Sequence, residues 1–384
     1  MAEKLADQPD YRAEYVFTEE QGELRKAVRK FSESHFDEPR TRELMASDKP
    51  FDPKVWARLG AELGVLGLSV PESDGGVGGS LIDQAVAVEE LGARLATGPL
   101  FGTVYLAIPA LVAAPSGAAR DELLAELIEG RRTAAVAFDP VTVTADGDVL
   151  TGALTQVVDG PIADEFLVAA TGPEGVALYA VAAGEVDVTA LQTLDLTRSE
   201  ANVTLSGAAG RLIAGPDDAP RVVEHALQVG AALLAVEQVG AAKHLLDLSV
   251  EYAKSRLQFG RPIGSFQAVK HRLADDLVQV EHARSTAYHA IWALADGSDD
   301  PALATSIAQA VCSAALSTVA TDTIQVHGGI GFTWEHQAHL YYKRAATDAV
   351  LLGSAEQHRD RVAAMVLDDA DADRAPRVAD GLPA

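Results

Sequence analysis

Apolar residues recur at two different spacings along this chain, and the changes of spacing divide it into three parts. From Phe17 to about Leu127 they return every three or four residues, which is the spacing of amphipathic helices. Between Thr133 and about Ala214 the chain consists of short runs rich in valine, threonine and alanine, separated by Asp-Gly and Gly-Pro turns, which predict strands. Helical spacing returns after Pro220. The pattern predicts an α+β protein with a helical region, a small β-barrel or sandwich, and a second helical region.

The last region contains three apolar-periodic segments that are longer than ordinary globular helices. They cover residues 221–257, 266–294 and 301–326, and such lengths favour a four-helix bundle that also serves as an oligomer core. The tail after them is rich in aspartate, which predicts disorder. We expect the following division: an N-terminal α-helical domain over residues 1–132, a β domain over 133–216, the bundle over 217–366 and a disordered tail over 367–384.

Composition and charge narrow the possible functions. The chain has 384 residues, of which 48% are hydrophobic, so it can bury a large core. Its 31 Lys and Arg against 56 Asp and Glu give a net charge of −25, which disfavours nucleic acids and anionic membrane surfaces as partners. We find no apolar run of membrane-spanning length and no signal-peptide pattern. The single cysteine excludes an internal disulfide, so we expect a protein of the reducing cytoplasm.

Two motifs in the last third contain residues suited to phosphate binding. The first, YAKSRLQFGRPIGSFQAVKHRLAD, spans residues 252–275, and the second, QVHGGIGFTWEHQAHLYYKRA, spans residues 325–345. In the first motif Arg256 precedes the break at Phe259 and Gly260, so its guanidinium is expected near a helix end, where it could clamp a pyrophosphate. The alternative role for this arginine is a surface ion pair with a carboxylate.

The glycines of the second motif are compatible with a ligand that approaches the backbone closely. Gly328, Gly329 and Gly331 have no Cβ to obstruct a dinucleotide, although a helix C-cap and turn would use the same residues. His327 could contact a cofactor or simply pack at the helix end. The histidines further along this motif lack a HExxH pattern or other companion ligands, so we predict no metal site.

These two motifs, in this order and after a β region, resemble the acyl-CoA dehydrogenase family of flavoproteins, and the resemblance covers nearly the whole chain. It implies FAD as cofactor, α,β-desaturation of an acyl-CoA thioester, and an electron-transfer flavoprotein as acceptor. In the family, the residue matching Arg256 reaches the flavin pyrophosphate of the neighbouring subunit, and the residue matching Phe259 lies near the flavin. The resemblance implies further cofactor contacts by Gln267, Gln325, His327, Gly328, Gly329 and Gly331.

The chain departs from the family at the positions of the catalytic base. Where many relatives carry a glutamate before the glycine of a late loop, this chain has Leu352, and where others carry it on the first long C-terminal helix, this chain has Gly230. The next carboxylate further along that helix belongs to Glu237. Its apolar surroundings predict either packing with a polar partner or a base with a raised pKa. Glu356, just after the late loop, is a weaker candidate.

The β region also lacks residues that surround the flavin ring in relatives. The segment after Asp139 runs at once into the next strand, so a Gly-Ser-Asp loop of the family looks deleted. Gln156 occupies the position of a flavin-stacking tryptophan, and Val158 that of a hydroxyl residue. The differences from the family therefore fall on the substrate and ring side of the site, while the phosphate side is retained.

A site shared between two different subunits explains why only the substrate and ring side differs from the family. We expect a FAD-dependent acyl-CoA dehydrogenase subunit that supplies the phosphate clamp, while a paralogous partner in an α₂β₂ heterotetramer supplies the base. This chain resembles the non-basic subunit of actinobacterial heterotetrameric enzymes of steroid side-chain degradation, which implies a bulky, steroid-derived acyl-CoA. Two alternatives stay open: a self-sufficient homotetramer that uses Glu237, and a flavin-free structural subunit.

Overall fold

The computed structural model describes residues 16–47, 49–139 and 141–367. Within these ranges the chain forms two compact units, with the boundary between Val223 and Glu224. The predicted disordered tail lies outside the described residues except for Leu367, which ends the last helix.

The first unit begins with helices whose starts are fixed by capping side chains. Thr18 and Gln21 form a capping box at the first helix, and Ser80 forms another with Asp83, so that backbone N–H groups without helical partners are satisfied. The segment before α6 (Ile108–Ala113) is a π-helix, in which Gly102 N–H donates to buried Asp159 at 2.8 Å. The helices are α2 (Glu19–His35), α3 (Glu38–Met45), α4 (Pro53–Ala61), α5 (Leu81–Gly92), the π-helix η3 (Leu100–Ala107), α6 (Ile108–Ala113) and α7 (Ala118–Ile128).

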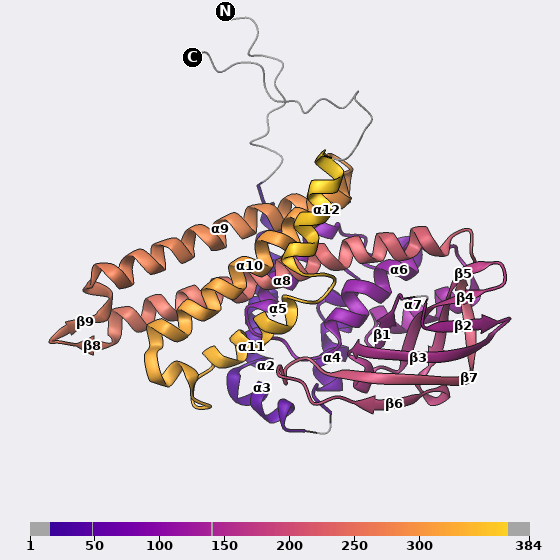
Figure 1. The fold of residues 1–384 in the computed structure, drawn as a ribbon, viewed down its shortest axis with the longest axis horizontal. Coiled ribbons are helices and arrows are strands. Elements are labelled where there is room, and N and C mark those ends of the chain that lie inside the picture. The colour runs from indigo at the N-terminus through magenta and orange to yellow at the C-terminus, as the bar shows by residue number, and fades with distance from the viewer. Residues whose placement is uncertain (1–15, 48, 140, 368–384) are drawn as a thin grey trace, which may run out of the picture. The chain divides into compact units, whose positions relative to one another are not determined.

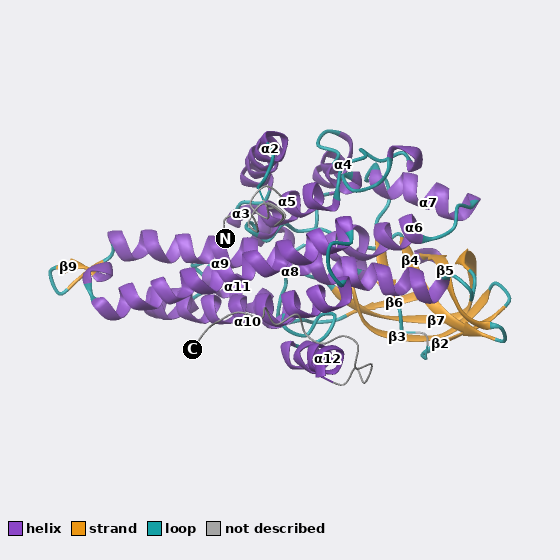
Figure 2. Ribbon diagram, turned by 90° about the horizontal axis from the view of Figure 1, so that it is seen from above, coloured by secondary structure: helices purple, strands orange, loops and turns teal. Residues whose placement is uncertain are grey.

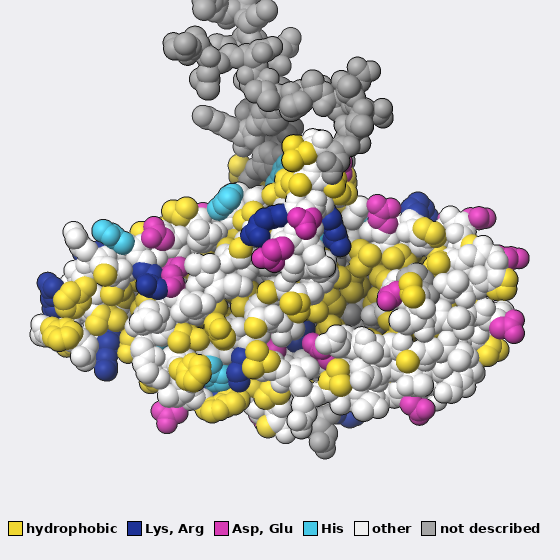
Figure 3. Space-filling view, in the orientation of Figure 1, with side chains coloured by type: hydrophobic (Ala, Val, Ile, Leu, Met, Phe, Trp, Pro, Cys, Tyr) yellow, Lys and Arg dark blue, Asp and Glu magenta, His cyan; other side chains and the backbone are white. Residues whose placement is uncertain are grey.

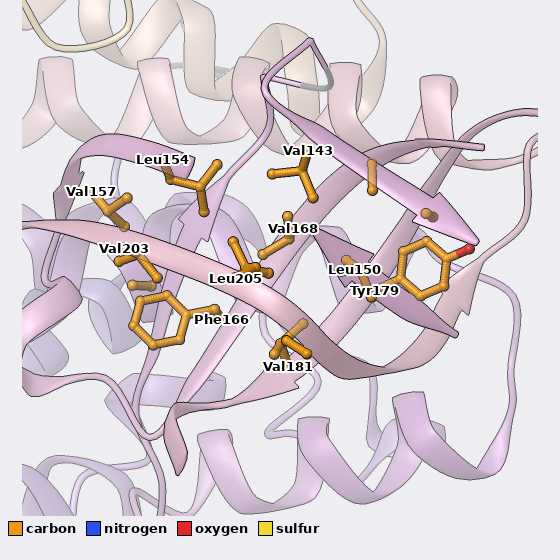
Figure 4. Packing of buried hydrophobic residues seen from close by; sticks show 14 of the residues in the cluster. Val143, Leu150, Leu154, Val157, Phe166, Val168, Tyr179, Val181, Val203 and Leu205 are labelled. Carbon is orange, nitrogen blue, oxygen red and sulfur yellow. The ribbon is translucent and has the colours of Figure 1, made fainter. Parts of the chain in front are cut away.

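The β region of this unit is a seven-stranded sheet that closes on itself. Strands β4, β2, β3, β7 and β5 follow one another, and β5 pairs back with β4 to complete the ring. Apolar side chains fill its interior around Phe166, Leu150 and Leu205 (Figure 4). The strands are β1 (Ala134–Ala137), β2 (Val143–Asp146), β3 (Val149–Val158), β4 (Glu165–Gly172), β5 (Gly175–Ala182), β6 (Asp187–Ala190) and β7 (Glu200–Ala214).

The second unit is a bundle built on long helices, which run side by side in Figures 1 and 2. Buried polar contacts fix their register, since Gln309 Nε2 donates to the Ala231 carbonyl at 2.6 Å and Ser249 Oγ donates to Thr323 Oγ1 at 3.1 Å. The elements are α8 (Ala219–Ser255), the hairpin strands β8 (Leu257–Gln258) and β9 (Arg261–Pro262), η6 (Ile263–Ser265), α9 (Gln267–Asp296), α10 (Pro301–His327), η7 (Gly328–Phe332), α11 (Ala338–Asp348) and α12 (Ala355–Leu367).

Two helices of the bundle meet the length and composition of a membrane span, which the sequence analysis did not expect of any segment. They are Ala219–Ser255 and Pro301–Phe332, and 72% and 61% of their apolar windows are buried within the protein. The core helices of a bundle are apolar for the same reason as a membrane span, because both bury most of their circumference. The burial therefore favours packed core helices.

The predicted fold class is confirmed, with helices, then a β region, then a helical bundle. The three long segments predicted in the last third correspond to α8, α9 and α10. The sequence analysis missed β6, α11 and α12. The limits proposed for the individual domains stay a prediction.

Candidate functional site

The first motif forms the end of α8, a short hairpin and the start of α9. Arg256 is the first residue after α8, and its carbonyl accepts a hydrogen bond from Ile263 N–H at 2.9 Å across the hairpin. The two central turn residues, Phe259 and Gly260, both have positive φ, at 54° and 75°, as a type I′ turn requires. The left-handed region costs a residue with a side chain roughly 1–2 kcal/mol. Phe259 adopts this left-handed conformation although its side chain is 91% exposed, so burial of the ring does not offset the strain.

The hairpin carries positive charge in an otherwise acidic chain. Residues 252–272 contain five Lys and Arg and no Asp or Glu, against a net charge of −25 for the whole chain. Dark-blue side chains accordingly gather at the hairpin end of the molecule in Figure 3. Arg256, Arg261 and Lys270 are exposed and have no ion pair among the described residues. The guanidinium of Arg261 lies 4.0 Å from the ring centroid of Phe266, which restricts its orientation.

The second motif ends α10 and turns into η7. His327 is buried, its Nδ1 lies 2.8 Å from the Thr323 carbonyl, and its ring stacks on Tyr252 with centroids 4.3 Å apart. Burial lowers the pKa of His327, although the bond to Thr323 opposes the shift. The ring is therefore neutral at pH 7 and donates through Nδ1. Because Tyr252 belongs to the first motif and His327 to the second, this stack brings the two motifs to the same end of the bundle.

The three glycines of the second motif differ in whether the fold of the chain requires glycine at their positions. Gly328 has φ +64°, and a Cβ on Gly331 would lie 3.0 Å from the His327 Cβ, so the fold itself explains both residues. Gly329 has no positive φ, and no atom lies within 4 Å of the place that a Cβ would occupy there. Nothing among the described residues therefore requires glycine at this position. A ligand or partner that approaches the backbone would provide the missing reason.

The remaining predicted cofactor contacts lie on α9 and α10. Gln267 is the first residue of α9, and Gln325 lies in the last turn of α10, and both residues are exposed. Arg272, near the start of α9, forms an ion pair with Asp322, near the end of α10. This pair shows that the start of α9 lies beside the end of α10.

Glu237, the weak candidate base, is one half of a buried ion pair. Its Oε1 accepts a hydrogen bond from Arg344 Nη1 at 2.6 Å, and both side chains are only 4% exposed. Arg344 lies on α11 and is thus the polar partner that the sequence could not identify. A carboxylate held by a guanidinium is stabilised in its charged form and is correspondingly weak as a proton acceptor.

The late loop has an unusual backbone conformation, and it has no carboxylate at the family's base position. Leu352 and Gly353 both have positive φ, at 58° and 112°. His358 is buried on α12, and its Nε2 lies 3.2 Å from the Leu352 carbonyl, which holds the loop in this conformation. Burial lowers the pKa of His358. Gly230 is buried within α8, and Glu356 is exposed on α12.

In the first unit, the two positions that the sequence analysis assigned to the flavin ring hold side chains with neither an aromatic face nor a hydroxyl. Gln156 is exposed at a β-bulge with φ +55°, and its N–H donates to Asn202 Oδ1. Val158 is buried and has no hydroxyl to donate. The connection between β1 and β2 comprises only residues 138–142, which leaves little chain for a cofactor loop.

Sequence reasoning missed several charged residues near the two motifs. Arg261 and Lys270 lie within the first motif but were not distinguished from surface cations. Asp276 is buried on α9 and lies within hydrogen-bonding reach of Asp322 on α10. An aspartate inside an apolar stripe was the available signal for it. Among the described residues no group of three or more His, Cys, Asp or Glu is placed to hold a metal ion.

The fold and the motifs match one family over most of the chain. Residues 18–131 match the acyl-CoA dehydrogenase N-terminal domain, and residues 220–367 match the acyl-CoA dehydrogenase C-terminal domain. The chain therefore belongs to the acyl-CoA dehydrogenase family, whose members are oxidoreductases acting on CH–CH bonds.

Three relatives narrow the comparison. Acyl-CoA dehydrogenase IpdE2 of Mycolicibacterium smegmatis is 37% identical over 349 residues, covering 91% of this chain and 99% of the relative. The ChsE4-ChsE5 complex of Mycobacterium tuberculosis contains a chain that is 33% identical with a TM-score of 0.81, covering 90% of this chain and 97% of that chain. A chain of the Tcur3481-Tcur3483 steroid ACAD, solved as a G363A variant, is 30% identical with a TM-score of 0.82, covering 91% and 98% respectively.

The conformation of Phe259 yields a prediction about stability. Phe259→Gly should leave the free energy of unfolding unchanged or raise it by up to about 1 kcal/mol, because glycine accepts a positive φ without strain and little packing is lost. The fully buried Phe166 serves as the contrast, since Phe166→Ala should cost about 3–5 kcal/mol. Urea unfolding followed by circular dichroism measures both. A large loss of stability in Phe259→Gly would show that this ring serves the fold of its own chain.

The Glu237–Arg344 pair yields a second prediction. Glu237→Gln should lower the free energy of unfolding by about 3–5 kcal/mol, because the Arg344 charge would stay buried without its counter-ion. Glu251→Gln is the matched control, since Glu251 pairs with Lys254 on an exposed surface and should change stability by less than about 1 kcal/mol. If Glu237→Gln keeps wild-type stability but abolishes turnover, the structural role is wrong and the role of base is favoured.

Proposed function

We propose that this chain is the subunit of a FAD-dependent acyl-CoA dehydrogenase that holds the diphosphate side of the cofactor, while a paralogous partner supplies the catalytic base. One contrast supports the proposal most strongly. Arg256 is exposed and unpaired among the described residues, whereas Glu237 is buried in an ion pair with Arg344. The described part of the chain thus offers a cation to a diphosphate and no carboxylate at the family's base positions.

The residues fit one end of the cofactor and not the other. A diphosphate carries two negative charges, and the hairpin offers exposed guanidinium groups beside a backbone segment with room at Gly329. Gln156 and Val158 offer neither an aromatic face nor a hydroxyl for an isoalloxazine ring. The absent ring contacts would therefore come from the partner.

Each residue of the clamp has a separate task. Arg256 and Arg261 would neutralise the charge of the diphosphate. Gln267 and Gln325 would donate hydrogen bonds from their side-chain amides to the cofactor. Gly329 would let the cofactor approach the backbone closely. Phe259, held outward in a strained conformation, would be buried against the neighbouring subunit and its flavin.

When bound, the flavin supplies the hydride-accepting step of desaturation. A base within hydrogen-bond reach of the substrate α-proton is still required, and Leu352 cannot serve.

The comparisons support the partner and the substrate class of this proposal. One similar structure is a ChsE4-ChsE5 complex and another is a Tcur3481-Tcur3483 steroid ACAD, so we infer a heteromeric assembly, an α₂β₂ arrangement, and a bulky steroid-derived acyl-CoA. An electron-transfer flavoprotein as acceptor and a location in the cytoplasm complete the proposal. We also retain the domain limits at residues 132/133 and 216/217.

The clamp is tested by changing Arg256 alone. Arg256→Ala in the assembled protein should weaken FAD binding by about 10- to 150-fold, because a charge-assisted hydrogen bond contributes roughly 1.5–3 kcal/mol. Arg256→Lys should retain part of the affinity, since it keeps the charge and loses the bidentate geometry. Lys254→Ala is the control, because Lys254 pairs with Glu251. Flavin absorbance after gel filtration measures retention, and an unchanged FAD content in Arg256→Ala rejects the clamp together with the heteromeric site built on it.

The missing base is tested by expressing the chain with and without a paralogue that carries glutamate in the late loop. Alone, the chain should show turnover at least 10²-fold lower than the pair, since a general base supplies about 10²–10⁴-fold in rate. Glutamine in place of the paralogue's base should abolish turnover of the pair while FAD stays bound. Full flavin content together with full activity in this chain alone would contradict the proposal and favour the homotetramer.

A further inference from the structure

Asp276 is a buried acid that links α9 to α10. The residue is 2% exposed, and one carboxyl oxygen, Oδ1, is buried with no hydrogen-bond partner among the described residues. The carboxyl lies within hydrogen-bonding reach of Asp322 on α10, which also forms the ion pair with Arg272. Two carboxyl groups and one guanidinium therefore meet at the contact between the two helices.

A proton on one of the two carboxyl groups would stabilise this arrangement. The charged groups that act on Asp276 are Asp322 from α10 and Arg272 and Asp275 from its own helix. Burial, followed by the charge of Asp322, raises the pKa of Asp276 from 3.8 to about 7, and Arg272 opposes the shift. In the neutral form Asp276 donates its O–H to the Asp322 carboxylate. In the ionised form two carboxylates face each other with a single guanidinium between them.

Asp322 lies at the part of α10 that leads into the glycine segment. The next residue, Thr323, accepts hydrogen bonds from Ser249 Oγ at 3.1 Å and from His327 Nδ1 at 2.8 Å. Gln325 follows within the same turn, and Gly331 lies against His327. A shift of Asp322 away from α9 would therefore move residues that would hold the cofactor.

We propose that the neutral carboxyl of Asp276 is a positioning group for the end of α10, and that its ionisation loosens the segment from Asp322 to Gly331 and weakens retention of the dinucleotide. The effect on retention rests on the proposed clamp, whereas the effect on the helix end does not. The sign follows from linkage. An unfolded aspartate loses its proton near pH 4 and the folded one near pH 7, so the native contact loses stability as the pH rises through this interval.

Hydrogen exchange of the wild-type protein without added FAD tests the helix end directly. After correction for the intrinsic pH dependence of exchange, amides of residues 322–331 should exchange up to about tenfold faster at pH 8 than at pH 6, because at pH 8 about ten ionised carboxyls exist for each neutral one. Asp276→Asn keeps the side-chain volume and an N–H donor toward Asp322 but has no titration, so its exchange should be the same at both values. Asp275→Asn, on the exposed neighbour, should keep most of the wild-type pH dependence, because Asp275 has the smallest effect of the charges that act on Asp276.

Retention of FAD is then measured on the assembled protein over the same pH range. The dissociation constant should rise about tenfold from pH 6 to pH 8 in the wild type and stay constant in Asp276→Asn. If Asp276→Asn fails to fold, Asp322→Asn replaces it and should move the pH dependence to lower pH, because the repelling charge is removed. A pH dependence that persists unchanged in Asp276→Asn overturns the proposal. A pH-dependent helix end with pH-independent FAD retention supports the positioning of the helix end and overturns its effect on the cofactor, while Arg256→Ala decides separately whether the clamp exists.

Discussion

The packing of α8, α9 and α10 at one end of the bundle is the constraint on which the candidate site depends. Tyr252 at the end of α8 stacks on His327 at the end of α10, and Arg272 of α9 pairs with Asp322 of α10. Two motifs that are about 70 residues apart in sequence thereby share one location. The buried bonds of Gln309 and Ser249 fix the register of α8 against α10. A slip of one turn, about 5.4 Å, would separate the hairpin from the glycine segment.

Several residues at this end are exposed and make few contacts with the chain that contains them. Phe259 adopts a strained backbone and is almost fully exposed, and Arg256 and Lys270 have no counter-ions among the described residues. Backbone strain persists where surrounding structure or function requires it, and exposed cations without ion pairs are available to a ligand or partner. By contrast, Glu237 and Arg344 satisfy each other inside the bundle. The chain thus directs positive charge and an exposed aromatic ring outward, which is the distribution expected of a residue set that completes a site on another molecule.

Much of the fold could be predicted from the sequence, because long helices and half-buried strands leave a clear period. The segments 221–257 and 301–326 were identified within a few residues of α8 and α10. The strand β6 was missed because it has only four residues, DVTA, too few for their alternation to be distinguished from a loop. The Glu237–Arg344 pair could not be foreseen, because the two residues are 107 positions apart and only the packing of α8 and α11 brings them together. Local sequence also contains no sign that Phe259 adopts a positive φ.

Two buried acids of the bundle differ in what faces them, and this difference decides their chemistry. Glu237 faces a guanidinium, which stabilises its charge and removes it from proton transfer. Asp276 faces another carboxylate, and burial first and this second negative charge next raise its pKa to about 7. The proton-sensitive acid therefore lies between α9 and α10, beside the segment that would hold a dinucleotide, and not at a position where relatives carry their base. This contrast supports the proposals that a proton in this chain controls a contact between helices and that a partner supplies the carboxylate that abstracts the substrate proton.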